Sequence, residues 1–246
     1  MLNIIGLGYS IDPTVKGLSL IKSSDKVFLE SYTSPVDNNI KEEVEEKIGR
    51  SVEVIKREEV ESDYLIKQSR GGDISLLVIG DPFFATTHIA LIVEAEKEGV
   101  KVNIVNNASI FNGVGKTGLS LYKFGRTVTL AYWRENYKPT SPIKFIEKNK
   151  SIGLHTLVLL DVDKKPMDAK EGINLLKKME EIEGINIIEE LVVLSRLGRN
   201  DEKITYGKVE NLLKVELGKP LFSFIVPGEL NQVEKEFLFR YSINNL

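Results

Sequence analysis

The chain has 246 residues with a formal net charge of −3, and 42% of its residues are hydrophobic. This composition is typical of a globular protein with a sizeable core, and the slight acidity argues against a broad basic surface for nucleic acid. Because the sequence contains no cysteine, it excludes disulfides, a thiolate nucleophile and a cysteine-ligated metal site. Neither a basic leader nor an apolar run of about 20 residues is present, so we expect a cytoplasmic protein without a membrane span.

Short β-rich runs alternate with longer segments of helical period along the chain. This pattern is typical of βα units on a largely parallel sheet, so we predict an α/β fold. In the first half, the predicted strands are Leu2–Leu7, Lys26–Glu30, Val52–Lys56, Ile74–Ile79 and Val102–Val105. The predicted helices of this half are Thr14–Ile21, Ile40–Ile48, Glu59–Ser69 and Thr87–Glu98.

A second series of elements follows the segment Ala108–Leu119. Its predicted strands are Thr127–Ala131, Thr156–Asp161, Glu190–Ser195 and Phe222–Val226. Its predicted helices are Ile143–Lys150, Ala169–Ile182, Val209–Glu216 and Gln232–Arg240. We therefore expect two α/β domains, residues 1–112 and 113–246. No linker rich in Pro, Gly or Ser separates them, which favours halves that pack closely over halves on a flexible tether.

Two glycines, Gly6 and Gly8, follow the first predicted strand, where small residues allow a tight turn and a close approach to a ligand. A dinucleotide-binding fingerprint needs a third glycine at the start of the next helix, but the next glycine here is Gly17. Taken alone, the segment therefore fits an ordinary turn as well as it fits a ligand site.

A more specific motif is the segment from Gly80 to His88, which reads Gly-Asp-Pro-Phe-Phe-Ala-Thr-Thr-His after a buried strand. Either threonine can cap the helix that follows, and a ligand is expected at such a strand end. Asp81 can accept hydrogen bonds from ribose hydroxyls or an ammonium group, and the backbone beside Phe84 can cover an apolar part of the ligand. The alternative is that Asp81 only stabilises its own turn.

The sequence contains two histidines, His88 and His155, which are too few for a transition-metal cluster without cysteines. No Gly-x-Ser-x-Gly elbow supports a serine hydrolase. For both histidines we expect a hydrogen-bonded structural role, and the sequence assigns no catalytic residue.

Blocks along nearly the whole chain resemble archaeal diphthine synthases, members of the tetrapyrrole-methylase-like group. The matching blocks are Ile5–Gly8, Thr14–Leu18, Glu30–Ser34, Gly80–His88, Asn107–Ile110, Gly113–Gly115, Thr117–Leu119, Tyr122–Gly125, Gly153–Leu157 and Ile225–Leu230. The resemblance implies two α/β domains with a cleft for S-adenosylmethionine between them, and a homodimer.

The family's cofactor contacts, carried over by position, fall on Tyr9, Asp81, Phe84, Ser109, Ile110, Leu160, Leu197 and Phe222. Many of these are expected to act through the main chain, because apolar side chains occupy several of the positions. Relatives commonly have His where this chain has Phe222 and Asn231.

The implied activity is successive methylation of the amino group on a modified histidine of translation elongation factor 2, a step of diphthamide biosynthesis. S-adenosylmethionine is the methyl donor, S-adenosylhomocysteine is the product, and no metal is needed. Two alternatives stay open at this point, namely methylation of a tetrapyrrole on the same scaffold and a non-catalytic nucleotide-binding module.

Overall fold

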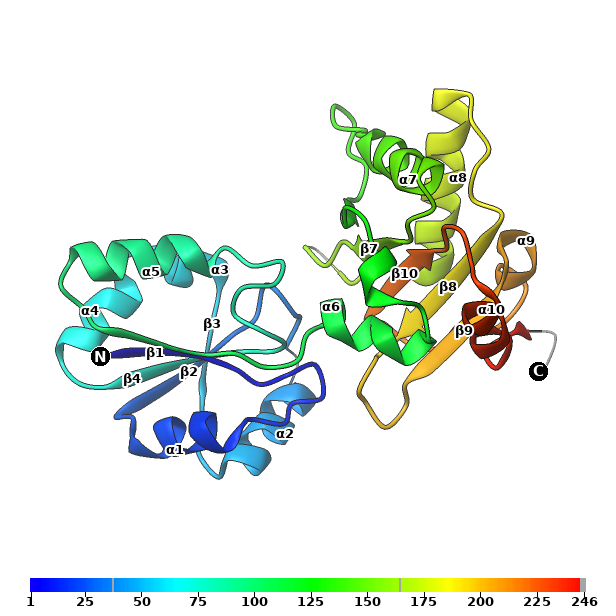
Figure 1. Cartoon of the computed structure of the whole chain (residues 1–246). Helices are drawn as coiled ribbons and strands as arrows, with labels where there is room; N and C mark the ends of the chain where they lie inside the picture. Colours follow the sequence, from blue (N-terminus) through cyan, green and yellow to red (C-terminus); the bar gives the residue numbers. More distant parts are fainter. Residues whose placement is uncertain (37, 164, 244–246) are drawn as a thin grey trace. The chain divides into compact units, whose positions relative to one another are not determined.

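The computed structural model describes residues 1–36, 38–163 and 165–243. Over this described chain, contacts divide the protein into two compact units, Met1–Phe111 and Asn112–Leu246 (Figure 1), one residue before the boundary expected from the sequence. Within the described residues, helices long and apolar enough to cross a membrane are absent.

The first unit is built on a parallel sheet whose strands run in the order β3-β2-β4-β1-β5. The strands are β1 (Leu2–Gly6), β2 (Lys26–Glu30), β3 (Glu53–Ile55), β4 (Ile74–Val78) and β5 (Val102–Val105). Parallel sheets are covered on both faces, so their strands read as nearly continuous apolar runs, as β1 and β4 do here.

Helices cover both faces of this sheet (Figure 1). They are α1 (Val15–Ser23), α2 (Asn38–Ile48), α3 (Arg57–Val60), α4 (Tyr64–Arg70) and α5 (His88–Lys97). One apolar core joins α1 and α2 to the sheet, and another joins α3, α4 and α5 to the opposite face.

The single helix predicted over Glu59–Ser69 is wrong, because α3 and α4 are separate helices. Ser62 lies between them, and its hydroxyl donates to the carbonyl of Glu59 at 2.9 Å and accepts from the amide of Tyr64 at 3.2 Å. Such side-chain bonds compete with the helical backbone pattern and end a helix locally.

The second unit contains a mixed sheet in the order β6-β7-β10-β8-β9. Its strands are β6 (Val128–Leu130), β7 (Thr156–Leu160), β8 (Glu190–Ser195), β9 (Lys203–Lys208) and β10 (Phe222–Val226). The pair β6–β7 is parallel, whereas β7–β10, β10–β8 and β8–β9 are antiparallel. The largely parallel sheet predicted from the sequence is therefore wrong for this unit.

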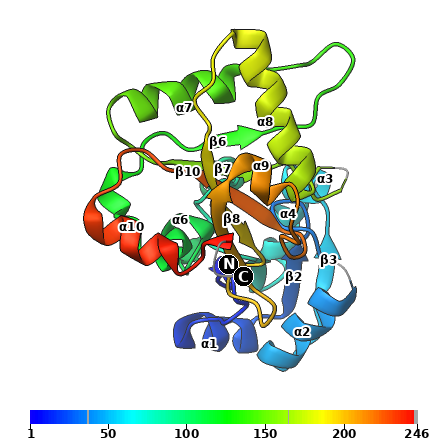
Figure 2. The same cartoon turned by 90° about the vertical axis from the view of Figure 1, so that its right-hand side faces the viewer.

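The helices of the second half include α7 and α8, which pack on one face of this sheet (Figures 1 and 2). The bounds are α6 (Ile110–Gly113), α7 (Ser141–Ser151), α8 (Ala169–Glu183), α9 (Val209–Leu212) and α10 (Gln232–Phe239), with 3-10 turns at η1 (Val114–Thr117) and η2 (Leu121–Lys123). Helix α8 begins with a capping box formed by Asp168 and Glu171, and Gly184 ends it in the left-handed conformation. The sequence predicted α9 too long, to Glu216.

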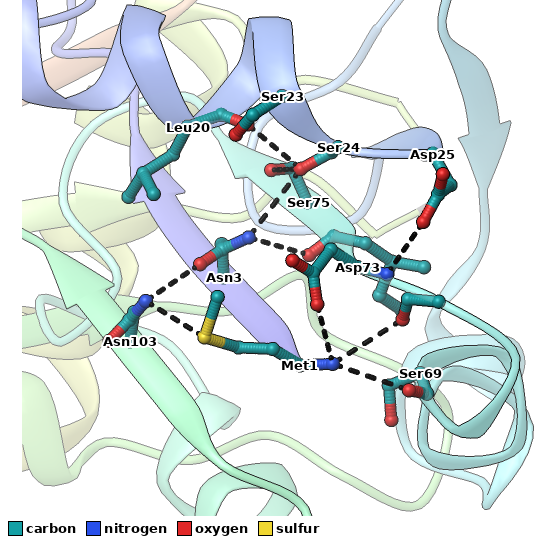
Figure 3. A network of polar contacts seen from close by, with 12 residues as sticks. Met1, Asn3, Leu20, Ser23, Ser24, Asp25, Ser69, Asp73, Ser75 and Asn103 are labelled. Carbon is teal, nitrogen blue, oxygen red and sulfur yellow. Dashed lines mark hydrogen bonds and ion pairs between the residues drawn. The ribbon is translucent and has the colours of Figure 1, made fainter.

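A buried polar ladder crosses the first sheet at the amino ends of its strands (Figure 3). Asn3 on β1 is paired in register with Ser75 on β4 and Asn103 on β5. The Asn3 side chain donates to the carbonyl of Ile74 at 3.1 Å and accepts from the Asn103 amide at 3.0 Å. The hydroxyls of Ser24 and Ser75 are 2.7 Å apart. A register slip would leave these buried groups unpaired, so the ladder favours the observed register.

Candidate functional site

The carboxyl ends of β1 and β4 form the topological switch point of the first sheet. The chain leaves β1 towards β2 on one side of the sheet and leaves β4 towards β5 on the other. Open α/β sheets bind ligands where neighbouring strands lead off in opposite directions. The loops after β1, β4 and β5, residues 7–12, 79–87 and 106–111, are therefore the candidate site.

Glycines allow the loops after β1 and β4 to approach each other closely. A Cβ atom on Gly6 would lie 2.7 Å from the carbonyl oxygen of Gly80, and the amide of Gly8 donates to that same oxygen at 3.0 Å. Gly80 itself has a φ of +98°, and a Cβ atom there would meet no atom within 4 Å. Gly80 is buried, but the position beside its Cα has room for another atom, which fits a ligand that contacts main-chain atoms.

Asp81 joins the loop after β4 to the loop after β5. Its side chain is 2% exposed, and its Oδ1 accepts from the amide of Phe83 at 2.9 Å. Its Oδ2 accepts from the amide of Asn107 at 2.9 Å and from the side chain of Asn106 at 3.1 Å. A carboxylate has about four lone-pair positions, so these three bonds leave capacity for one more. Asp81 thus stabilises its own turn and organises the neighbouring loop.

His88 fixes the far end of the same loop. Its ring is buried, and Nδ1 lies 3.1 Å from the carbonyl oxygen of Pro82, which requires the proton to be on Nδ1. The hydroxyl of Thr86 donates to the same carbonyl. The expected structural role of His88 is confirmed for Nδ1, whereas Nε2 is buried without a hydrogen-bond partner among the described residues.

The expectation that a threonine side chain caps α5 is wrong. Thr87 stands at the N-cap position of α5, but its side chain makes no capping bond in the described structure. Its hydroxyl instead lies 3.1 Å from the hydroxyl of Tyr32 and donates to Glu61 at 3.0 Å.

The structure brings the predicted contacts of the first unit together. The amide of Tyr9 donates to the carbonyl of Ala108 at 3.1 Å, which joins the loops after β1 and β5. The buried Ser109 accepts from the amide of Phe111 at 3.2 Å through its hydroxyl, and Ile110 begins α6. With Asp81 and Phe84, these residues lie on connected loops at the carboxyl edge of the sheet.

Phe111 is a neighbour of the site that the sequence analysis did not select. Its ring stacks on that of Phe84, with centroids 5.0 Å apart and planes inclined by 30°. Phe84 is 47% exposed and Phe111 is half-buried. The available signal was the position of Phe111 directly after Ser109 and Ile110.

The predicted contacts of the second unit also share one sheet edge. Leu160 ends β7, Leu197 follows β8, and Phe222 begins the antiparallel β10 opposite Ser195. The side chains of Leu160 and Phe222 belong to the apolar core under α7 and α8. Main-chain contacts are therefore the mode open to both residues at this edge.

Asn231 has a structural role in this chain. Its Oδ1 accepts from the amide of Glu234 at 2.9 Å, and its own amide donates to Glu234 Oε2 at 2.9 Å, which forms a capping box on α10. The Lys123 ammonium lies 2.8 Å from the same carboxylate. His155 Nδ1 accepts from the amide of Gly228 at 2.9 Å, so Nε2 holds the proton and donates to Glu234 Oε1 at 3.3 Å.

This network shifts the pKa of both buried groups. Burial raises the pKa of Glu234, but the hydrogen bonds from Lys123, the amides of Asn231 and Ser120, and His155 outweigh it and lower the pKa to about 2. Burial lowers the pKa of His155, against the opposing effect of its bond to Glu234. The hydrogen bonds of both ring nitrogens confirm the expected structural role of His155.

The described residues hold no group of three or more His, Cys, Asp or Glu side chains arranged to bind a metal ion.

Comparison with known proteins places these features in a family context. Residues 1–213 match the family described as Tetrapyrrole (Corrin/Porphyrin) Methylases. The diphthine synthase of Methanocaldococcus jannaschii is 39% identical, with 100% of both chains covered. The diphthine methyl ester synthase of Homo sapiens is 38% identical over 97% of this chain and 93% of its own. A crystal structure of diphthine synthase superposes with a TM-score of 0.88 at 34% identity, covering 100% of this chain and 98% of that one.

Proposed function

The chain belongs to the diphthine synthase family of the tetrapyrrole methylases, and we propose that it methylates the amino group of the modified histidine of elongation factor 2. Membership confirms the resemblance drawn from the sequence motifs and the two-part α/β fold, and it makes the chain a methyltransferase of diphthamide biosynthesis. The observation that carries the proposal is the 39% sequence identity to a diphthine synthase over the full length of both chains. This identity disfavours a tetrapyrrole substrate and a non-catalytic module.

The proposed methyl donor is S-adenosylmethionine, whose bound sulfonium supplies an activated methyl group. The room beside the Cα of Gly80 fits a cofactor held through main-chain contacts. In the first unit we propose contacts from Tyr9, Asp81, Phe84, Ser109 and Ile110. In the second unit we propose main-chain contacts from Leu160, Leu197 and Phe222, because the buried side chains of these three residues leave their peptide groups as the contact surface.

Methyl transfer places two demands on the residues around the cofactor. The acceptor amine must lose its proton, because a primary amine is largely protonated at neutral pH and only the neutral form is nucleophilic. It must also be aligned with the methyl group. The hydrogen bonds that Asp81 accepts from both loops fix the positions of the loops that we propose to contact the cofactor. We also propose that the protein acts in the cytoplasm as a homodimer, as its family resemblance implies.

The decisive experiment is transfer of label from S-adenosylmethionine to elongation factor 2 that carries the unmethylated histidine modification. The expected result is a labelled factor whose mass rises by whole methyl groups. A corrinoid precursor serves as the second acceptor and is expected to stay unlabelled. Label on the corrinoid alone, or on neither acceptor while an M. jannaschii-type enzyme labels the factor, would overturn the proposal.

A further inference from the structure

We propose that the stacked rings of Phe84 and Phe111 bind the positively charged sulfonium end of the cofactor through a cation–π contact. The inference rests on the proposed use of S-adenosylmethionine and assigns a role to Phe111, which lies outside the contact set drawn from the family. It concerns the discrimination between the sulfonium of the donor and the neutral thioether of its product.

The position of the ring pair is the first observation. Phe84 follows the Gly80–Asp81 turn by three residues, and Phe111 follows Ser109 by two, so each ring extends from a loop proposed to contact the cofactor. The two loops are joined by the Asp81–Asn107 bond, which fixes the places from which the rings project. The pair therefore lies within the candidate site.

The exposure of the pair is the second observation. Phe84 is 47% exposed although it stacks on Phe111 at a centroid distance of 5.0 Å. Covering an exposed aromatic ring gains hydrophobic free energy, so a ligand bound against this ring pair would be stabilised by the contact. A stacked pair also presents a rigid π-face, because each ring restricts the other.

The charges of the surrounding loops indicate which part of the cofactor the ring pair binds. The loops 7–12, 79–87 and 106–111 contain the acids Asp12 and Asp81 and no Lys or Arg. Asp12 is paired with Lys47 at 3.1 Å, whereas Asp81 accepts its three hydrogen bonds from neutral amide groups. An acidic side chain on the same loop as an exposed aromatic ring favours a cation, and the sulfonium is a cation that S-adenosylhomocysteine lacks.

Adenine stacking is the competing explanation, and the two make different predictions. Adenine is identical in S-adenosylmethionine and S-adenosylhomocysteine, so the loss of a stacking contact with adenine would weaken the binding of both ligands equally. A cation–π contact contributes to the charged donor alone. The ratio of the two affinities therefore separates the explanations.

The experiment is calorimetric titration of the whole chain and of Phe84→Leu, Phe111→Leu and the double variant with each ligand. We expect each single variant to weaken S-adenosylmethionine binding by about 2- to 5-fold relative to S-adenosylhomocysteine. The double variant should lose less than the product of the single losses, because the rings form one surface. Phe84→Tyr retains a ring and should keep the wild-type ratio.

Phe239→Leu provides the matched control, since Phe239 is a 57% exposed phenylalanine on α10 in the second unit, and it should leave the ratio unchanged. Thermal unfolding of every variant checks that it is folded. An equal loss for both ligands, or no loss for either in a folded variant, would overturn the inference while leaving the proposed function intact. Failure of the wild-type chain to bind either ligand would instead overturn the proposed function on which the inference rests.

Discussion

His155 donates a hydrogen bond to Glu234 at 3.3 Å between two buried side chains, and this contact joins segments that are 79 positions apart in the chain. The blocks Tyr122–Gly125, Gly153–Leu157 and Ile225–Leu230, which carry the family resemblance, all meet around this pair. Their shared role in this structure is to hold α10 in place.

The first prediction concerns acid stability. Glu234 has a folded pKa of about 2 against an ordinary value of 4.5, so its contribution is complete above pH 4.5 and is lost as the pH falls towards 2. That contribution is on the order of 3 kcal/mol. His155 has a folded pKa below 6.5, so its contribution is present above pH 6.5 and is lost as the pH falls below that value.

Both groups therefore destabilise the fold on acidification. Urea unfolding measured from pH 8 to pH 3 should show a falling free energy of unfolding, and Glu234→Gln should flatten the fall below pH 4.5. If the free energy of unfolding of that variant fell with pH as it does in the wild type, the low pKa of Glu234 would not be the cause of the fall.

The second prediction compares two glycines of positive φ. A Cβ atom meets no neighbour within 4 Å at either Gly49 or Gly80, and both residues have a positive φ. Gly49→Ala and Gly80→Ala should therefore each cost about 1–2 kcal/mol through backbone strain. Calorimetry should show weaker S-adenosylmethionine binding for Gly80→Ala alone. Equal affinities in the two variants would remove Gly80 from the site.

The third prediction tests Asp81 as the organiser of the site. Asp81→Ala removes the acceptor for the amides of Phe83 and Asn107, so both loops lose their fixed positions. We expect S-adenosylmethionine affinity to fall by about tenfold or more, which corresponds to the loss of one charged hydrogen bond. Asp81→Asn retains an acceptor oxygen and should lose less. Wild-type affinity in the folded Asp81→Ala variant would show that the loops do not depend on this carboxylate.

The first unit follows from its sequence because its strands are buried on both faces and alternate with helices. Its strands were predicted to within one residue at each end, as Lys26–Glu30 and Val102–Val105 illustrate. The strand β9 was missed because Lys203 and Lys208 bound it and Gly207 interrupts its β-forming residues, which favours a loop. Without β9, the β8–β9 hairpin and hence the antiparallel pairs of this mixed sheet were not predictable.

The candidate site shows the same division. The glycine turns and Asp81 were predicted because Gly and Asp directly after a buried strand indicate a tight turn at a position where α/β sheets bind ligands. The bonds from Asp81 to Asn106 and Asn107 depend on two loops 25 positions apart, so no local pattern reveals them. The stacking of Phe111 on Phe84 is likewise a tertiary contact between those loops.

The last prediction separates stability from ligand binding by using the opposite edge of the first sheet. Asn3→Ala removes the acceptor for the side-chain amide of Asn103 (Figure 3). It also removes the donor to the carbonyl of Ile74. Leaving such buried groups unpaired costs about 1–3 kcal/mol. Because this ladder lies at the amino ends of the strands and the candidate site lies at their carboxyl ends, the folded variant should bind S-adenosylmethionine with wild-type affinity. Urea unfolding and calorimetry on the same preparation measure both effects. A lower free energy of unfolding with unchanged affinity is expected, whereas a loss of affinity without a loss of stability would contradict the separation of the two ends of the sheet.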